Sequence, residues 1–362
     1  MKYAFEQHGI EVFGWTDLLD EPQLIHFCKE FKPDAIFEMN RSRANLPNLP
    51  RHIIHIAWIV DLGHHEINDF SGSQILYFFN KRWLQFANNN LADIVSWLPP
   101  GYCPLRYKMQ RKKKTIDFSF AGHIPGPWTQ NELDRKISIS SESPHLTFRD
   151  IAELCCKNWK IKDQPIIALN ALRNSPIISP KTLSEISKCM VNDRILKYDI
   201  NCRIGRAYSR ERLIDLALQV SGSLRIVGSP SWKLWPEYEK YYAGYVSKTE
   251  ELSTLYQSSR INLHEGVSLH MRLFDCMGAG GCLLYLRQSG FDFSQDPIHT
   301  YFEENQHYIL ADTDDFIEVT KSYLRDDKKR ENIAFQAARL VESEHIWSKR
   351  MERIVDDVKK LI

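Results

Sequence analysis

The chain has 362 residues, of which 43% are hydrophobic and 12% are aromatic, so it is long enough to form about two domains with buried cores. Its 47 basic and 46 acidic residues leave a net charge of +1, which gives no global reason to expect nucleic acid or an acidic surface as a partner. The chain begins without the apolar core of a secretory signal and contains no run of about 18 apolar residues, so no membrane span is expected.

Short apolar runs alternate with helical patterns through the first hundred residues. Four runs are strand candidates: 34–39, 53–60, 75–80 and 93–99. They are continuous rather than alternating, which is typical of strands that are buried on both faces. Segments 21–31 and 81–91 can supply crossover helices between them. This rhythm predicts a parallel α/β sheet.

A proline-rich break at 99–104 ends this series, and a basic run follows at 108–114. We interpret the basic run as a solvated linker, because no aromatic residues are interleaved with it as in a nucleic-acid patch. A second series of strands is predicted at 115–122, 224–228, 261–264 and 282–286. The stretch 127–200 is mostly helical in pattern, which indicates a helical insertion in the second domain.

The end of the chain predicts one more helix, over 346–362. Its apolar residues share one helical face: 351, 354, 355, 358, 361 and 362. We expect this helix to cross back to the N-terminal domain.

The stretch 261–281 places many polar groups between two apolar segments. Its first four residues predict a strand, after which the chain turns through Glu265 and Gly266 into a helix from about Ser268 to Ala279, with Ser268 as the N-cap. The carboxyl end of a parallel strand followed by a helix N-terminus favours anions. We therefore expect a diphosphate there, with Glu265 accepting hydrogen bonds from neutral sugar hydroxyls.

Two interpretations of the following helix stay open. Arg272 and Asp275 are three residues apart, so they either pair within the helix or bind phosphate and ribose respectively. The glycine cluster 278–281 ends the helix as a C-cap and tight turn. It is not a dinucleotide fingerprint, because that motif opens a helix after a strand.

With "LRIVGSPSW", "YAGYVSKTEELSTLYQSSRINLHEG" and "MRLFDCMGAGGCLLY", the sequence resembles the C-terminal half of CgeB-like (spore-maturation-type) glycosyltransferases, which are related to group 1 glycosyltransferases. The resemblance is good over 220–356, partial over 30–125 and poor over 127–200. It implies a GT-B fold, in which two Rossmann-like domains with parallel sheets face each other across a cleft. The expected boundaries are 1–105 for the acceptor domain, 115–345 for the nucleotide-sugar domain with its insertion at about 127–200, and 346–362 for the last helix.

The resemblance also implies which residues form the donor site: Gly122, Arg206, Tyr245, Val246, His264, Glu265, Gly266, Arg272 and Asp275. Gly122 falls in the loop where backbone approaches the donor phosphates, and Tyr245 and Val246 fall where the nucleobase is read. Asp275 takes the place of a glutamate that binds ribose.

This sequence differs from the family pattern in two respects. Group 1 enzymes often carry two glutamates separated by seven residues, whereas Glu265 and Asp275 are separated by nine and the second is an aspartate. The family's first strand and its loop are also missing from the start of the chain.

We predict that the protein is an enzyme that transfers a sugar from a nucleoside-diphosphate sugar to an acceptor hydroxyl, with neither a metal nor another cofactor. Positioning and stabilisation of the departing diphosphate lower the barrier, with Arg272, the amides near 265–268 and Arg206 or Arg210 as the candidate groups. Glu265 and Asp61 are the candidate catalytic residues.

The acceptor side is predicted in the N-terminal domain. Asp61 ends a predicted strand and is the candidate general base for an inverting reaction, with His64 beside it; a helix cap is the structural alternative for Asp61. His64 and His65 are adjacent and poorly spaced for joint metal ligation. The acceptor is a glycan, a protein or a small molecule.

Two rival functions stay open. The first is a nucleotide-sugar epimerase, which has the same fold but needs acid and base groups at C2 of the donor sugar. The second is a non-catalytic binding or scaffold protein that retains only a GT-B-like core. A dehydrogenase is not favoured, because no G-x-G-x-x-G follows a strand. The eight cysteines are scattered without a CxxC pair, which is typical of free thiols in a reducing cytoplasm.

Overall fold

The computed structural model describes residues 1–14, 19–62, 65–88, 90–137, 146–157, 178–266, 269–287 and 296–362. The chain divides into two compact units. The first consists of Met1–Pro104, Ser268–Phe274 and Leu340–Ile362, and the second consists of Leu105–Val267 and Asp275–Arg339. None of the helices described is long and apolar enough to cross a membrane.

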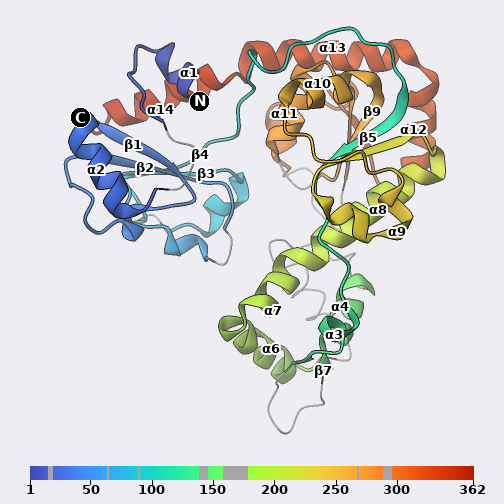
Figure 1. The fold of residues 1–362 in the computed structure, drawn as a ribbon, viewed down its shortest axis with the longest axis horizontal. Helices are drawn as coiled ribbons and strands as arrows, with labels where there is room; N and C mark the ends of the chain where they lie inside the picture. Colours follow the sequence, from blue (N-terminus) through green and yellow to red (C-terminus); the bar gives the residue numbers. More distant parts are fainter. Residues whose placement is uncertain are drawn as a thin grey trace. The chain divides into compact units, whose positions relative to one another are not determined.

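The first unit contains a four-stranded parallel sheet in the order β1-β2-β3-β4 (Figure 1). Its strands are β1 (Ala35–Met39), β2 (Ile54–Ile59), β3 (Ile75–Phe78) and β4 (Ile94–Trp97). All four lie within the predicted runs, and β3 is buried along its whole length. Continuous apolar runs therefore identified strands that are covered on both faces.

The helical segments of the first unit follow local signals. Helix α2 (Glu21–Phe31) starts at Asp20, whose side chain forms a capping box with Gln23, and ends at Lys32 in the left-handed conformation. The predicted helix at 81–91 is instead a 3₁₀ helix, η3 (Lys81–Phe86). It serves as a tight connection that packs Trp83 against the apolar clusters on both sides of the sheet. The remaining short elements are α1 (Lys2–Glu6), η1 (Arg43–Asn45) and η2 (Ile67–Asp69).

Helix α14 (Trp347–Lys359) belongs to the first unit. Met351 and Ile354 are buried in the same apolar cluster as Trp58 and Tyr77 of the sheet. The Tyr77 hydroxyl also donates to Asp357 at 2.6 Å, inside the core. The predicted apolar face of this helix is thus the buried one, except that Ile362 at the end of the chain is exposed.

The second unit contains a five-stranded parallel sheet in the order β11-β10-β9-β5-β8. Its strands are β5 (Ile116–Ala121), β8 (Leu224–Val227), β9 (Ser259–His264), β10 (Leu283–Leu286) and β11 (Ile309–Ala311). The helices beside this sheet are α8 (Ile204–Val220), α10 (Thr249–Ser258), α11 (Met271–Gly278), α12 (Phe316–Arg325) and α13 (Asp327–Glu344). Short connections are formed by η5 (Pro230–Leu234), α9 (Pro236–Glu239) and η7 (Pro297–Thr300).

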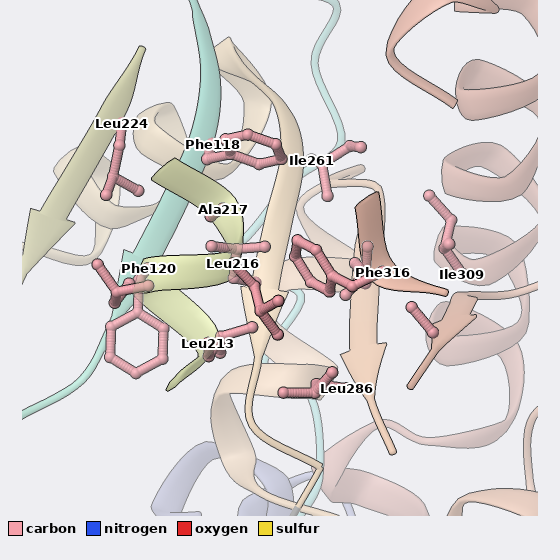
Figure 2. Packing of buried hydrophobic residues seen from close by; sticks show 14 of the residues in the cluster. Phe118, Phe120, Leu213, Leu216, Ala217, Leu224, Ile261, Leu286, Ile309 and Phe316 are labelled. Atoms are coloured by element: carbon pink, nitrogen blue, oxygen red, sulfur yellow. The ribbon is translucent and has the colours of Figure 1, made fainter. Parts of the chain in front are cut away.

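The core of the second unit joins its sheet to α8. Figure 2 shows Phe118 of β5 and Ile261 of β9 beside Leu213 and Leu216 of α8, with Phe316 of α12 nearby. Each side chain of this size contributes roughly 1.5–3 kcal/mol when it is fully buried. This packing fixes α8 against the strands that carry the candidate site.

The stretch 127–200 is mostly helical where the structure describes it, as the sequence pattern predicted. It contains α3 (Gln130–Leu133), a short antiparallel pair β6 (Lys136–Ile137) and β7 (Leu146–Thr147), α4 (Phe148–Lys157), α6 (Pro180–Asn192) and α7 (Arg194–Tyr198). Phe148, Ile186 and Ile200 belong to an apolar cluster distinct from that of the sheet. A π-helical turn, η4 (Asp199–Arg203), leads directly into α8.

Candidate functional site

The candidate site lies at one edge of the second sheet. Because all five strands are parallel, the residues that follow β5, β8 and β9 meet at the carboxyl edge. These residues are Gly122 and His123 after β5, Gly228 after β8, and Glu265 and Gly266 after β9. Two of these loops require glycine.

Gly228 packs its backbone directly against that of Gly122. A Cβ atom on Gly228 would lie 1.9 Å from the Gly122 oxygen, and its φ of +143° is rarely adopted by other residues. The Gly122 amide donates to Val227 at 2.9 Å, and its carbonyl accepts from the buried Trp232 indole at 2.8 Å. Backbone without side chains therefore lines this part of the edge.

Gly266 makes a similar close approach at the end of β10. Its φ is +65°, and a Cβ there would lie 1.9 Å from the Leu286 oxygen. Its amide donates to the His264 ring at Nδ1, at 3.1 Å. The tight turn delays the following helix, so the prediction that α11 starts near Ser268 is wrong and the helix begins at Met271. Ser268 itself lies outside the described residues.

His264 is a buried residue of the sheet rather than a group on its surface. Its ring stacks on Tyr285 with a centroid distance of 5.4 Å and an interplanar angle of 8°. The Tyr285 hydroxyl in turn donates to the buried Asp296 at 2.9 Å. Because Nδ1 accepts the Gly266 amide, a neutral His264 carries its proton on Nε2.

A cluster of charged side chains faces the same edge. Arg206 and Arg210 are four residues apart on α8 and so share one helical face. Arg210 donates to Glu265 Oε1 from Nη2 at 2.5 Å and from Nε at 3.1 Å, and Nη1 donates to the His123 carbonyl. The Arg210 and Glu265 side chains are only 6% and 12% exposed, so this is a largely desolvated ion pair.

Arg206 differs from Arg210 in its partners. Its Nη1 lies 3.0 Å from His123 Nε2, and within the described residues it forms no ion pair with a carboxylate. The cluster therefore combines two guanidinium groups with one carboxylate, and Arg210 already engages that carboxylate. Its positive charge suits an anionic ligand.

Tyr245 and Val246 lie in a segment that runs beside β8. Ile226 pairs with Tyr242, and the Gly228 amide donates to the Gly244 carbonyl at 3.1 Å. This pairing carries the chain past the end of β8, where Tyr245 is 73% exposed and Val246 is half-buried. An exposed aromatic ring at the carboxyl edge is suited to stacking on a planar ligand.

The other predicted site residues are divided between the two units. Asp275 is half-buried on α11 in the second unit, whereas Arg272 belongs to the first unit, where its backbone amide donates to His270 Nδ1 at 3.2 Å. Asp61 is exposed after β2, and its amide donates to the Asn40 side chain at 3.0 Å. His64 lies outside the described residues.

One residue of the charged cluster was not singled out from the sequence. His123 directly follows Gly122 and contacts both arginines of α8. Its position could have indicated a site residue, because a side chain that directly follows a strand and a glycine reaches the carboxyl edge of a parallel sheet. Within the described residues, no group of three or more His, Cys, Asp and Glu side chains is arranged to hold a metal ion.

Residues 206–356 match a family described as glycosyl transferase-like. This part of the chain is thus similar to a glycosyl transferase-like domain. It begins at Arg206 and includes Arg210, Glu265 and the strands β8 to β11. No curated protein matches the chain.

Solved structures confirm the fold of the whole chain. Sucrose-phosphate synthase from Thermosynechococcus elongatus is 8% identical with a TM-score of 0.55, and the match covers 94% of this chain and 77% of that one. Anabaena HepE, solved in complex with UDP, is 11% identical with a TM-score of 0.52, covering 99% of this chain and 89% of HepE. HepE has also been solved in complex with UDP-glucose, with 11% identity, a TM-score of 0.51 and coverage of 99% and 88%. The stretch that matches the glycosyl transferase-like family therefore lies in a chain with the predicted GT-B fold.

Proposed function

We propose that the protein transfers a sugar from a nucleoside-diphosphate sugar to an acceptor hydroxyl, as a CgeB-like glycosyltransferase. The observation that carries this proposal is Arg206, a cation without a carboxylate partner in the described chain, beside bare backbone at the carboxyl edge of β5 and β8. A diphosphate fits such a place, because a guanidinium binds phosphate oxygens and glycine leaves room for them beside the backbone. The match of residues 206–356 to a glycosyl transferase-like family supports it.

The donor roles follow from positions along that edge. Arg206 binds the diphosphate, while Gly122 and Gly228 allow the donor to approach the backbone. Tyr245 and Val246 contact the nucleobase, since they extend past the end of β8. HepE has been solved in complex with UDP and with UDP-glucose, so uracil is the first nucleobase to test.

Further roles are assigned to the sugar side of the donor. Glu265, held by Arg210, accepts hydrogen bonds from donor hydroxyls near His264 and Gly266. Asp275 binds the ribose, and Arg272 is a second cation for the departing diphosphate. In the first unit, Asp61 and His64 contact the acceptor.

The reaction breaks the bond between the anomeric carbon and the diphosphate oxygen and forms a bond to the acceptor oxygen. The acceptor hydroxyl loses its proton, to Asp61 in an inverting reaction or to the departing diphosphate in a retaining one. Charge that develops on the diphosphate is stabilised by the guanidinium of Arg206, which is in place before the reaction starts. The proposed mechanism uses no metal or other cofactor.

A panel of UDP, GDP, CDP and TDP sugars tests this function, with thermal shift for binding and release of nucleoside diphosphate for turnover. A ligand at 100 times its dissociation constant stabilises the protein by about 2.7 kcal/mol. We expect one nucleobase to stabilise the wild type, and the corresponding sugar nucleotide to be turned over. Binding without turnover across a broad set of donors and acceptors would instead identify a GT-B scaffold protein.

A further inference from the structure

His123 occupies an unusual position between two arginines. Arg206 Nη1 lies 3.0 Å from His123 Nε2, and Arg210 Nη1 donates to the His123 backbone carbonyl. A guanidinium has only donors, so His123 Nε2 must accept and carries no proton. The imidazole in this arrangement is neutral, with its ring proton on Nδ1.

The charges around His123 explain this neutral state. The ring contacts Arg206, while Arg210, which binds the Glu265 carboxylate, contacts the His123 backbone carbonyl. The guanidinium of Arg206 at 3.0 Å disfavours a second positive charge on the imidazole. A diphosphate that binds at Arg206 brings two negative charges and reverses this balance.

We propose that His123 is itself a ligand of the donor diphosphate and takes up a proton from solvent when the diphosphate binds. This inference rests on the proposed function, because it requires a diphosphate at Arg206. The added proton sits on Nε2 and is donated to a phosphate oxygen, while Arg206 transfers its hydrogen bond from the imidazole to another phosphate oxygen. No covalent bond changes.

The sign of the pH dependence follows from this coupling. The pKa of His123 is higher in the complex than in the free protein, so donor affinity rises as the pH falls through the range between the two values. The diphosphate of a nucleotide sugar is a diester and does not titrate near neutral pH. Any proton that is taken up therefore belongs to the protein.

Glu211, which follows Arg210 in the sequence, could also exchange a proton in the pH range of the test, so it requires a control. Burial, together with Asp215 and Glu237, raises the pKa of Glu211 to about 7, so it titrates in the same range. It lies about 100° around α8 from Arg210 and faces those two carboxylates rather than His123. Glu211→Gln removes this titration and leaves the cluster at His123 intact.

The test is calorimetric titration with UDP-glucose, or with the sugar nucleotide that binds in the panel, from about pH 5.5 to 8 in buffers of different ionisation enthalpy. We expect uptake of close to one proton per donor and an affinity that rises by up to about tenfold per pH unit on acidification. His123→Gln should bind more weakly than the wild type, most clearly at the acidic end, and should show neither effect. Glu211→Gln and His26→Gln, which removes an exposed histidine, should retain the wild-type profile.

Two results would overturn the inference: no proton uptake by the wild type, or unchanged uptake by His123→Gln. The absence of proton uptake is measured on the wild type, so this result would overturn the inference even if His123→Gln folded poorly. Failure of every nucleotide sugar to bind at any pH would contradict the proposed function itself.

Discussion

Arg210 donates through two nitrogens to one oxygen of Glu265, at 2.5 and 3.1 Å, and this pair joins α8 to the end of β9. The same guanidinium holds the His123 carbonyl at the end of β5. One residue therefore fixes two of the loops that form the carboxyl edge. Arg206, one turn earlier on α8, has no comparable carboxylate partner within the described residues. We therefore expect Arg210 to have a structural role and Arg206 to bind the ligand.

The buried pair predicts a large and asymmetric effect on stability. Arg210→Met leaves the Glu265 carboxylate largely buried without its cation, which should lower the free energy of unfolding by about 3–5 kcal/mol. The double variant Arg210→Met, Glu265→Gln should be less destabilised than the sum of the single changes. Denaturant unfolding of all four proteins measures this coupling. Additive effects would show that the two side chains do not interact.

Arg206→Ala should weaken donor binding while leaving stability almost unchanged. A charged hydrogen bond contributes about 1.5–3 kcal/mol, which corresponds to a loss of affinity of roughly 10- to 150-fold. Arg206 is half-buried and has no ion pair in the described chain, so the fold does not depend on it. Arg212→Ala, an exposed arginine on the same helix, is the matched control. Equal affinities for the two variants would argue against a diphosphate at Arg206.

Gly228 and Gly266 lie in tight turns that leave no room for a side chain. Gly266→Ala places a Cβ 1.9 Å from the Leu286 oxygen at a φ of +65°, and Gly228→Ala places one 1.9 Å from the Gly122 oxygen. Each change should destabilise the protein by at least about 2 kcal/mol, because backbone strain and steric overlap combine. Gly222→Ala, where a Cβ meets nothing within 4 Å, should be nearly neutral. Thermal unfolding compares the three variants, and equal midpoints would contradict this geometry.

Glu38, in the first unit, should make the free energy of unfolding decrease in acid. Burial opposes its ionisation, but hydrogen bonds from His55 and Arg41 outweigh burial and hold the pKa of Glu38 below its ordinary value of 4.5. A carboxyl whose pKa is lowered by folding stabilises the protein above its unfolded pKa, and this contribution is lost as the pH falls through the folded pKa. The stability of the wild type should therefore fall on acidification below 4.5 more steeply than that of Glu38→Gln.

Unfolding at a series of acidic pH values measures this difference. Glu30→Gln, which alters an exposed pair with His26, should keep the wild-type slope. The same slope in Glu38→Gln as in the wild type would show that Glu38 is not held in its ionised form.

Continuous apolar runs made most of the strands predictable, because parallel strands are covered on both faces. Strand β11 and helix α8 are among the elements that this reasoning did not predict. Strand β11 has only three residues, too few for a pattern, and is recognisable only through its pairing with β10. Helix α8 is buried around much of its circumference, from Ile204 and Ala207 to Leu213 and Leu216, so it lacks a single apolar face.

The candidate site residues were predicted partly from strand ends and partly from the family resemblance, and their roles remain predictions. Gly122, Glu265 and Gly266 follow strands, and their positions at one edge result from the parallel sheet. The Arg210–Glu265 pair joins residues that are 55 positions apart, which no local spacing reveals. His123 became a candidate only once α8 was seen to carry both arginines to it.

The most direct test of the central claim is a crystal structure of the protein with bound UDP, or with the nucleoside diphosphate that binds in the panel. The account predicts phosphate oxygens within hydrogen-bond distance of Arg206, next to the backbone at Gly122, with the Arg210–Glu265 pair intact. An ordered diphosphate bound away from the carboxyl edge of β5, β8 and β9 would contradict it.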